Sequence, residues 1–325
     1  MSQKKIIVTG GAGFIGSAIV WRLNELGHDN IIIVDRRDDP AKKKNLSPLK
    51  FTQFVDADEF IARLDDFKAT DAIIHMGADS STTATDREWM MSNNYQYTVD
   101  LAEFAVANNI RFIYASSAAT YGDGSTGMAD GTDDLDKLQP LNLYGESKHL
   151  FDQYAAKRGM FDRIVGLKYF NVFGPNENHK GDMRSLVNKA YGQIQETDKL
   201  QLFKSAHPYY ADGEFGRDFV YVKDAVDMTL FFMENNIGGL FNVGSGKANT
   251  WNALADAIFQ ALGRETYVEY IEMPEILRDK YQYHTEADIT RLREAGYTAD
   301  VTPLDAAVAD YIQNYLSKGK YLGDI

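Results

Sequence analysis

Residues 5–16 constrain the fold of this chain more than any other stretch. They begin with apolar residues typical of a buried strand, continue into a turn with glycines at Gly10, Gly13 and Gly16, and lead into a helical pattern. Glycines at this spacing allow a tight turn, close approach of the backbone to a pyrophosphate, and close packing of the helix on the strand. The stretch therefore predicts a dinucleotide site with the phosphates at the N-terminus of the helix.

The residues after the glycines complete a strand–helix–strand unit. Apolar residues recur at helical spacing as far as Gly27, namely Ile15, Ile19, Leu23 and Leu26. Residues 31–34 then predict a second buried strand, which ends in Asp35. A carboxylate about twenty residues after such glycines stands where the adenosine ribose of a dinucleotide binds.

The residues that follow Asp35 bear on which dinucleotide binds. A carboxylate alone favours the free 2′-hydroxyl of NAD, whereas neighbouring cations favour the 2′-phosphate of NADP. Arg36, Arg37 and Lys42 supply such cations. We therefore expect NADP, with NAD as the alternative.

The composition is that of a chain with a substantial core. With 325 residues, of which 44% are hydrophobic, the chain is long enough for one large domain and a smaller one, and we expect an α/β enzyme. The net charge of -13 opposes binding to nucleic acid, and the run at residues 42–44 is too short to overcome it.

Metal sites and membrane spans are not expected. The sequence has no cysteine, and its six histidines show no paired ligand spacing. No apolar run approaches the roughly twenty residues that span a bilayer. The first residues lead directly into a strand without the apolar core of a signal peptide, so we expect a cytoplasmic protein.

Strands and helices continue to alternate beyond Asp35. Strands are predicted at residues 72–75, 111–115 and 164–170, and helices at about residues 98–107 and 144–157. This alternation predicts a Rossmann-like, doubly wound parallel sheet. Residues 77–83 and 116–122 follow two of the strands and are rich in small polar residues. Because ligands bind outside the carboxyl ends of such strands, we expect both segments to face the site.

The regular alternation ends after Phe170, where we expect a smaller, discontinuous α/β substrate domain to begin. Core-like runs at residues 219–222 and 240–243 indicate that the chain returns to the first domain. We expect the dinucleotide domain to comprise residues 1–170 with about 218–247 and 282–296, and the substrate domain to comprise 171–217, 248–281 and 297–325.

Three further local features are expected. Residues 122–140, rich in glycine and aspartate, predict a surface loop. Thr250 is expected to cap a helix that Gly263 ends, and residues 302–305 (Thr-Pro-Leu-Asp) to open the last helix as a capping box.

Tyr144 and Lys148 are the candidate catalytic pair. Their spacing of four puts both side chains on one face of the predicted helix. A tyrosine ordinarily titrates near pH 10, so a phenolate base at neutral pH must be favoured by about 4 kcal/mol. A lysine ammonium and a positive nicotinamide ring have the required sign. Ser117, at a strand end, is predicted to hydrogen-bond the same substrate hydroxyl.

Several motifs identify a family resemblance. The chain resembles extended short-chain dehydrogenases/reductases that act on nucleotide sugars in residues 10–16 (GGAGFIG), 116–122 (SSAATYG) and 144–148 (YGESK). It resembles the ADP-glyceromanno-heptose 6-epimerases over nearly its whole length, through residues 77–83, 93–97, 169–175, 179–181, 217–222 and 280–282. The resemblance implies an isomerase that inverts C6 of ADP-D-glycero-D-manno-heptose through a transient 6-keto sugar, in lipopolysaccharide core biosynthesis. It also implies that the protein is a homo-oligomer, with a pentamer as one candidate assembly.

The resemblance assigns roles residue by residue. It implies that Tyr144 and Lys180 are the two acid/base groups. It implies NADP contacts from Phe14, Ile15, Asp35, Arg36, Lys42, Asn93, Lys148 and Val172. With the three glycines and the strand-end residues Met76, Gly77, Ala78, Asp79 and Ser80, these make up the predicted cofactor set. It implies that Asn171, Phe203, Arg217 and Tyr281 hold ADP-heptose, and the predicted substrate set also includes Ser80, Lys180, Asp182, Lys189, Lys204, Ser205 and Ala206.

The chain also departs from the family pattern. Asp182 and Lys189 replace a serine and a histidine, Ala57 replaces a lysine on the cofactor side, and residues 207–216 form a longer segment. These differences leave a 4-epimerase as an alternative. A 4,6-dehydratase is disfavoured because alanines at 118 and 119 stand where it needs an acidic pair. A non-catalytic NADP sensor would have no reason to keep Ser117, Tyr144 and Lys148 together.

Overall fold

The fold is described from a computed structural model that covers residues 4–36, 39–275 and 282–325. The first strand, turn and helix form as predicted: β1 (Ile6–Thr9) leads through the glycines into α1 (Phe14–Glu25), and β2 (Ile31–Asp35) ends at the predicted carboxylate. The other elements of the first half are α2 (Pro40–Leu46), β3 (Gln53–Asp56), α3 (Ala57–Ala62), β4 (Ala72–His75), α4 (Arg87–Met90), α5 (Tyr97–Ala107), β5 (Arg111–Ser117) and α6 (Leu143–Lys157).

The second half continues the alternation and adds two small sheets. Its elements are β6 (Ile164–Tyr169), β7 (Asn171–Phe173), α7 (Leu186–Thr197), β8 (Leu200–Phe203), β9 (Gly216–Tyr221), α8 (Val222–Glu234), β10 (Gly239–Val243), β11 (Ala248–Thr250), α9 (Trp251–Ala261), β12 (Val268–Ile271), α11 (Thr290–Glu294) and α12 (Leu304–Asp310). A 3-10 segment, η6 (Asn178–Met183), connects β7 to α7.

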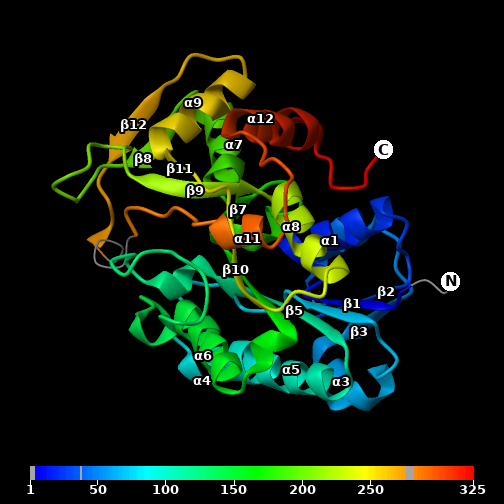
Figure 1. The fold of residues 1–325 in the computed structure, drawn as a ribbon. Helices are drawn as coiled ribbons and strands as arrows, with labels where there is room; N and C mark the ends of the chain where they lie inside the picture. The colour runs from blue at the N-terminus through cyan, green and yellow to red at the C-terminus, as the bar shows by residue number, and fades with distance from the viewer. Residues whose placement is uncertain (1–3, 37–38, 276–281) are drawn as a thin grey trace.

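Seven parallel strands form the central sheet, in the order β10-β6-β5-β4-β1-β2-β3. The order reverses direction at β1, as in a doubly wound fold, which confirms the predicted Rossmann-like class. Figure 1 shows α3, α5 and α6 below this sheet and α1 and α8 above it. Alternate residues of β1 serve the two faces: Ile6 and Val8 belong to the core under α1 and α8, whereas Ile7 belongs to the core on the α5 and α6 side.

The smaller sheets lie to one side of the central sheet, with α7, α9 and α12 (Figure 1). One contains β11, β9 and β7, and the other contains β12 and β8. β7 follows β6 after a single residue, so the chain passes directly from the end of the central sheet into the second region. That passage brings the substrate-side elements over the carboxyl end of β6.

One local prediction needs correction, one is confirmed, and one strand was not predicted. The predicted capping box at Thr302 is wrong: Thr302 donates its hydroxyl to Asp224 at 2.8 Å, and α12 begins after Pro303 without a side-chain cap. The sequence reading also missed β3, which pairs with β2 at the sheet edge. Thr250 does cap α9, accepting from the backbone N–H of Ala253 at 3.0 Å.

The predicted surface loop at residues 122–140 is fixed to the core through several contacts, two of which involve Leu135 and Asp130. Leu135 is buried, and the Asp130 carboxylate accepts the backbone N–H of Asn242 at 2.7 Å. Burial raises the pKa of Asp130 to about 6. Within the described residues, no helix has the length and apolar character needed to cross a membrane.

Candidate functional site

A cavity of about 1440 Å³ runs along the carboxyl ends of the central strands and continues between α7, β8 and β9. All sixteen residues of the predicted cofactor set line it, counting from Gly10 to Val172. The four predicted catalytic residues, Ser117, Tyr144, Lys148 and Lys180, line it as well. The tertiary structure therefore gathers these two sets at one site.

The glycine turn has the geometry that a dinucleotide requires. Gly10 has a φ of +65°, and a Cβ there would stand 2.7 Å from the backbone nitrogen of Gly77. A Cβ on Gly16 would collide with the carbonyl oxygen of Gly10, so the helix packs closely on the turn. Because Gly13 caps α1 with no side chain, the N-terminal amides of α1 face the cavity, where a diphosphate can accept from them.

Asp35 accepts three hydrogen bonds from groups of the protein. One carboxylate oxygen accepts the backbone N–H of Ala12 at 3.0 Å, and the other accepts the backbone N–H of Arg36 at 2.8 Å and the Lys42 ammonium at 3.0 Å. The Asp35 side chain is only 6% exposed, whereas those of Lys42 and Arg36 are 25% and 45% exposed. Two cations at this end of the cavity are therefore more exposed than the Asp35 carboxylate that they flank, although Asp39 also lines the cavity.

Arg36 is held by a group of neighbours that the sequence reading partly missed. Its guanidinium donates to Asn93 at 3.0 Å and to Asp58 at 3.3 Å, and it lies 4.9 Å from the centre of the Trp89 ring. The Trp89 indole N–H in turn donates to Asp79 at 3.2 Å. Trp89 follows a polar loop, and no local pattern marked it as a site residue. Arg37 lies outside the described residues.

Tyr144 and Lys148 lie one helical turn apart on α6, and Ser117 ends β5. Asn142 caps α6 by accepting the backbone N–H of Gly145 at 2.8 Å, which fixes the start of the helix just before Tyr144. Burial raises the pKa of Tyr144, and a hydrogen bond with the Ser117 side chain opposes that rise. Lys148 is 3% exposed, and burial lowers its pKa to about 8, against the opposing charge of Asp152.

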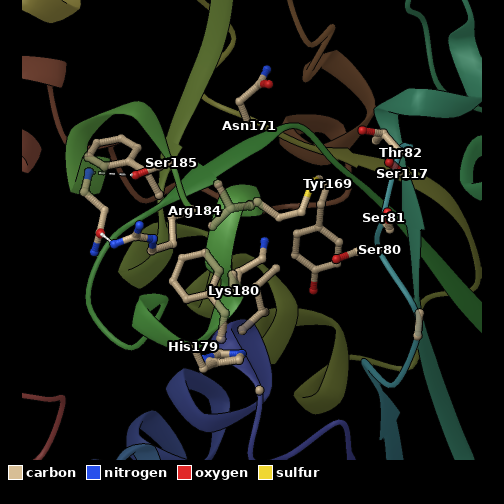
Figure 2. A pocket seen from close by; sticks show the side chains of 18 of the residues that line it. Ser80, Ser81, Thr82, Ser117, Tyr169, Asn171, His179, Lys180, Arg184 and Ser185 are labelled. Carbon is tan, nitrogen blue, oxygen red and sulfur yellow. Dashed lines mark hydrogen bonds between the residues drawn. The ribbon is translucent and has the colours of Figure 1, made fainter. Parts of the chain in front are cut away.

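Lys180 approaches the cavity from a different element. It lies in η6, and its ammonium is 5.4 Å from the centre of the Phe14 ring at the start of α1. Burial lowers the pKa of Lys180, while the nearby Glu177 carboxylate raises it. Figure 2 shows Lys180 pointing into the cavity, with Ser80, Ser81 and Ser117 on the opposite wall. Two groups that can exchange protons, Tyr144 and Lys180, thus enter one cavity from two separate elements.

Glu177, which the sequence reading missed, holds the loop that carries Lys180. It is 1% exposed, and its carboxylate accepts the backbone N–H of Gly174 at 3.3 Å and the Ser185 backbone N–H and hydroxyl at 2.5 and 2.6 Å. These bonds join the two ends of residues 174–185. An acidic residue amid the polar run before Lys180 was the available signal.

The structure brings only part of the predicted substrate set to the cavity. Ser80, Asn171, Lys180, Lys189, Phe203 and Arg217 line it. Asp182, Lys204, Ser205 and Ala206 are not among the lining residues: Lys204 pairs with Glu272 at 2.8 Å, and the Ser205 backbone N–H donates to Asp212. Tyr281 lies outside the described residues.

Arg217 and Asp218 are neighbours on β9 with different surroundings. Arg217 lines the cavity and donates to the Gly216 carbonyl at 3.2 Å. The Asp218 carboxylate accepts from the Ser245 backbone N–H and hydroxyl at 2.6 and 2.8 Å, and from the backbone N–H groups of Gly246 and Ala287 at 2.9 and 3.0 Å. The carboxylate therefore serves the backbone of two other segments.

The site fits a nicotinamide dinucleotide. The Gly10 and Gly16 positions leave no room for a Cβ, α1 presents its amides, and the Tyr144–Lys148 helix lines the same cavity. Across residues 4–36, 39–275 and 282–325, no group of three or more histidine and acidic side chains is arranged to hold a metal ion.

Comparisons with known proteins agree with this site. Residues 6–244 match the family described as the NAD dependent epimerase/dehydratase family. The ADP-L-glycero-D-manno-heptose-6-epimerase of Nitratidesulfovibrio vulgaris is 50% identical over 315 residues, which are 96% of this chain and 98% of that protein. The enzyme of the same name from Fusobacterium nucleatum is 46% identical, with the same shares covered.

A solved structure extends the similarity to three dimensions. The crystal structure of Helicobacter pylori ADP-L-glycero-D-manno-heptose-6-epimerase matches with a TM-score of 0.80 and 29% identity, over 96% of each chain. The chain therefore belongs to the NAD dependent epimerase/dehydratase family and, within it, to the ADP-L-glycero-D-manno-heptose-6-epimerases.

Proposed function

We propose that this protein inverts C6 of ADP-D-glycero-D-manno-heptose to give ADP-L-glycero-D-manno-heptose, with NADP as its retained cofactor. The observation that carries the proposal is the placement of two proton-exchanging groups, Tyr144 on α6 and Lys180 on η6, in one cavity with the dinucleotide turn. The names of the relatives supply the choice of sugar.

A bound nicotinamide dinucleotide supplies a hydride acceptor that takes hydride from C6 and returns it in the same catalytic cycle. Oxidation needs a base for the C6 hydroxyl proton, and Tyr144 is suited to it because the Lys148 ammonium favours its phenolate form. The Ser117 hydroxyl orients the same oxygen. The product of this half-reaction is a 6-keto sugar, in which C6 is planar.

Return of hydride to the other face of C6 inverts the centre and requires the oxygen to lie in a second orientation. Lys180 is suited to exchange the proton there, because it enters the cavity from η6 and its pKa is lowered by burial. Glu177, which ties the two ends of the loop, holds Lys180 in place. No net redox change results.

The NADP assignment rests on the charges at the end of β2. The Asp35 carboxylate is almost wholly buried and already accepts three hydrogen bonds, so it has one acceptor position left for a ribose 2′-hydroxyl. Arg36 and Lys42 line the cavity beside it and offer donors to a 2′-phosphate. The assignment is tested by denaturing the purified protein and identifying the released dinucleotide by mass spectrometry. NAD as the only dinucleotide found would overturn it.

On the substrate side, we propose that Arg217 grips the diphosphate and that Asn171 and Phe203 line the rest of the nucleotide-sugar site. A guanidinium donates through a planar fork that matches a diphosphate. Asn171 is oriented by donating to the Asp218 carbonyl at 3.1 Å and to the Thr285 hydroxyl at 3.2 Å. A homo-oligomer and a cytoplasmic location stay predictions.

The activity is tested by incubating the protein with a panel of nucleotide sugars and following the stereochemistry by NMR. Inversion at C6 of the ADP-heptose, with no net NADPH formed, is expected. Inversion at C4 of a UDP-sugar, with no change in the heptose, would overturn the proposal in favour of a 4-epimerase.

A further inference from the structure

A buried group of polar side chains lies between α6, β5 and β6, next to the proposed catalytic residues in sequence. Asp152 on α6 and Lys168 on β6 are both 0% exposed, and the Lys168 ammonium donates to the Asp152 carboxylate at 2.9 Å. The carboxylate also accepts from the Tyr114 hydroxyl on β5 at 2.7 Å and from the Ser116 hydroxyl at 2.7 Å. Each carboxylate oxygen is thus bound, as a buried charge requires.

This group connects the two elements that carry the proposed catalytic side chains. Asp152 is four residues after Lys148 and eight after Tyr144, so the three lie along one face of α6. On the other side, Ser116 directly precedes Ser117 in β5. The bond from Ser116 to Asp152 therefore ties the Ser117 strand end to the Tyr144–Lys148 helix.

Lys168 adds a second tie, to the turn that follows Ser117. Its ammonium donates to the Thr120 hydroxyl at 2.5 Å, and Thr120 donates to the Ser117 carbonyl at 2.8 Å. The same ammonium lies 4.9 Å from the centre of the Tyr121 ring. The backbone on both sides of Ser117 is thus anchored to the ion pair.

We propose that Asp152 is a positioning residue for the epimerase reaction: through its bonds to Ser116 and Lys168 it fixes Ser117 against the helix that carries Tyr144 and Lys148. The proposal rests on the proposed function of the site. Replacing a buried ion pair by apolar residues is often neutral for stability, so the Asp152–Lys168 pair is by itself weak evidence of a stabilising role.

The charges around Lys148 identify Asp152 as the carboxylate that acts on it. Two titratable groups interact electrostatically with Lys148, namely Asp152 on α6 and His75 on β4, and Tyr144 lies one turn before Lys148 on the same helix. On other elements against α6, Arg87 of α4 forms a surface pair with Glu146, and the Tyr95 ring contacts the Tyr154 ring. Asp152 is the one that raises the pKa of Lys148.

The experiment compares Asp152→Asn, Lys168→Met and the double variant with the wild type. Asp152→Asn leaves the Lys168 charge uncompensated, so the pKa of Lys148 is expected to fall by at least about one unit. Lys168→Met leaves Asp152 as an unpaired carboxylate, so the pKa of Lys148 is expected to rise. The double variant removes both charges and is expected to lie between the two single variants. Because the double variant leaves no unpaired buried charge, the pKa of Lys148 can still be measured in it if a single variant folds poorly.

Two readouts are independent of each other. NMR titration of protein labelled at lysine carbons, with Lys148→Arg to assign the signal, measures the pKa of Lys148 without any substrate. Steady-state kinetics with the ADP-heptose measures kcat, which is expected to fall at least about tenfold in Asp152→Asn while KM changes little, with the alkaline limb of kcat moved to lower pH.

The control is Asp310→Asn, which removes a carboxylate that accepts from Lys223 at 2.7 Å and from Tyr221 at 2.6 Å, away from the cavity. It is expected to lower stability without moving the Lys148 signal or the pH profile of kcat. The proposal is overturned by an unmoved Lys148 titration and unchanged kcat in Asp152→Asn. A wild type that is inactive on ADP-heptose, with the NMR shifts as expected, would instead overturn the proposed function alone.

Discussion

The ammonium of Lys180 lies 5.4 Å from the centre of the Phe14 ring, although the two residues are far apart in the sequence. Phe14 is the first residue of α1, so this contact seats the loop of Lys180 against the start of the dinucleotide helix. A lysine that the sequence places merely in a loop thus reaches the cavity from the side opposite Ser117 (Figure 2).

Lys180→Met and Tyr144→Phe are each expected to abolish C6 epimerisation. Each variant removes one proton-exchanging group, and each is expected to keep some ability to dismutate a 6-aldehyde analogue in one orientation. The double variant is expected to lose dismutation entirely. NMR of the analogue products checks this, and full epimerase activity in Lys180→Met would remove Lys180 from the mechanism.

Arg217 and Asp218 are expected to give opposite results although they are adjacent. Arg217→Met should raise KM for ADP-heptose at least about tenfold, with bound cofactor and thermal stability retained, if the guanidinium binds the diphosphate as proposed. Kinetics and a melting curve check this. Unchanged KM with a lowered melting temperature would show a structural role for Arg217.

Asp218→Asn serves as the matched variant. Its carboxylate accepts four hydrogen bonds from Ser245, Gly246 and Ala287, and an amide cannot accept all of them. We expect it to lower the free energy of unfolding by about 2 kcal/mol or more. Denaturant unfolding checks this value, which should exceed the change in Arg217→Met.

Removing the cations beside Asp35 is expected to weaken the preference for NADP. In the double variant Arg36→Ala and Lys42→Ala, the 2′-phosphate loses two donors, so NADP affinity should fall at least about tenfold while NAD affinity changes less. Calorimetric titration of protein stripped of cofactor measures both. An equal loss of affinity for both dinucleotides would mean that these side chains do not bind the 2′-phosphate.

His75 is expected to make the protein acid-sensitive. It is buried between the Thr9 and Thr98 hydroxyls, at 2.5 and 2.9 Å, and burial lowers its pKa to about 3. Between about pH 6.5 and pH 3 this histidine is protonated in the unfolded chain but neutral in the folded chain, so the free energy of unfolding falls as the pH falls. At about 1.4 kcal/mol for each pKa unit, the loss amounts to several kcal/mol.

The variant His75→Asn isolates this contribution. It is expected to be less stable than the wild type at pH 7, because it loses one of the threonine bonds, but its stability should fall less steeply below pH 6.5. The exposed His284→Gln is the control and should retain the acid loss of the wild type. If the free energy of unfolding fell equally steeply below pH 6.5 in the wild type and in His75→Asn, the prediction would be contradicted.

Much of the fold and of the cofactor end of the site follows from the sequence. The run from Ile6 to Gly16 carries its own strand, turn and helix signals, and the pattern of Tyr144 and Lys148 depends only on helical spacing. Such features are local, because the residues that create them lie within one or two turns of each other. The edge strand β3 escaped notice because its four residues are only partly buried and carry little apolar pattern.

Tertiary structure decided what local patterns cannot encode. The sequence alone predicted Thr302 as a capping residue. Packing places Asp224 within hydrogen-bonding distance of it, and the Thr302 hydroxyl donates to the Asp224 carboxylate and does not cap the helix. The sequence determined that Asp152 shares a helix face with Lys148. Only the folding of β5 and β6 beside that helix supplied Ser116 and Lys168 as its partners. A burial strong enough to shift the pKa of Lys148, His75 and Lys180 arises only where distant segments exclude water together.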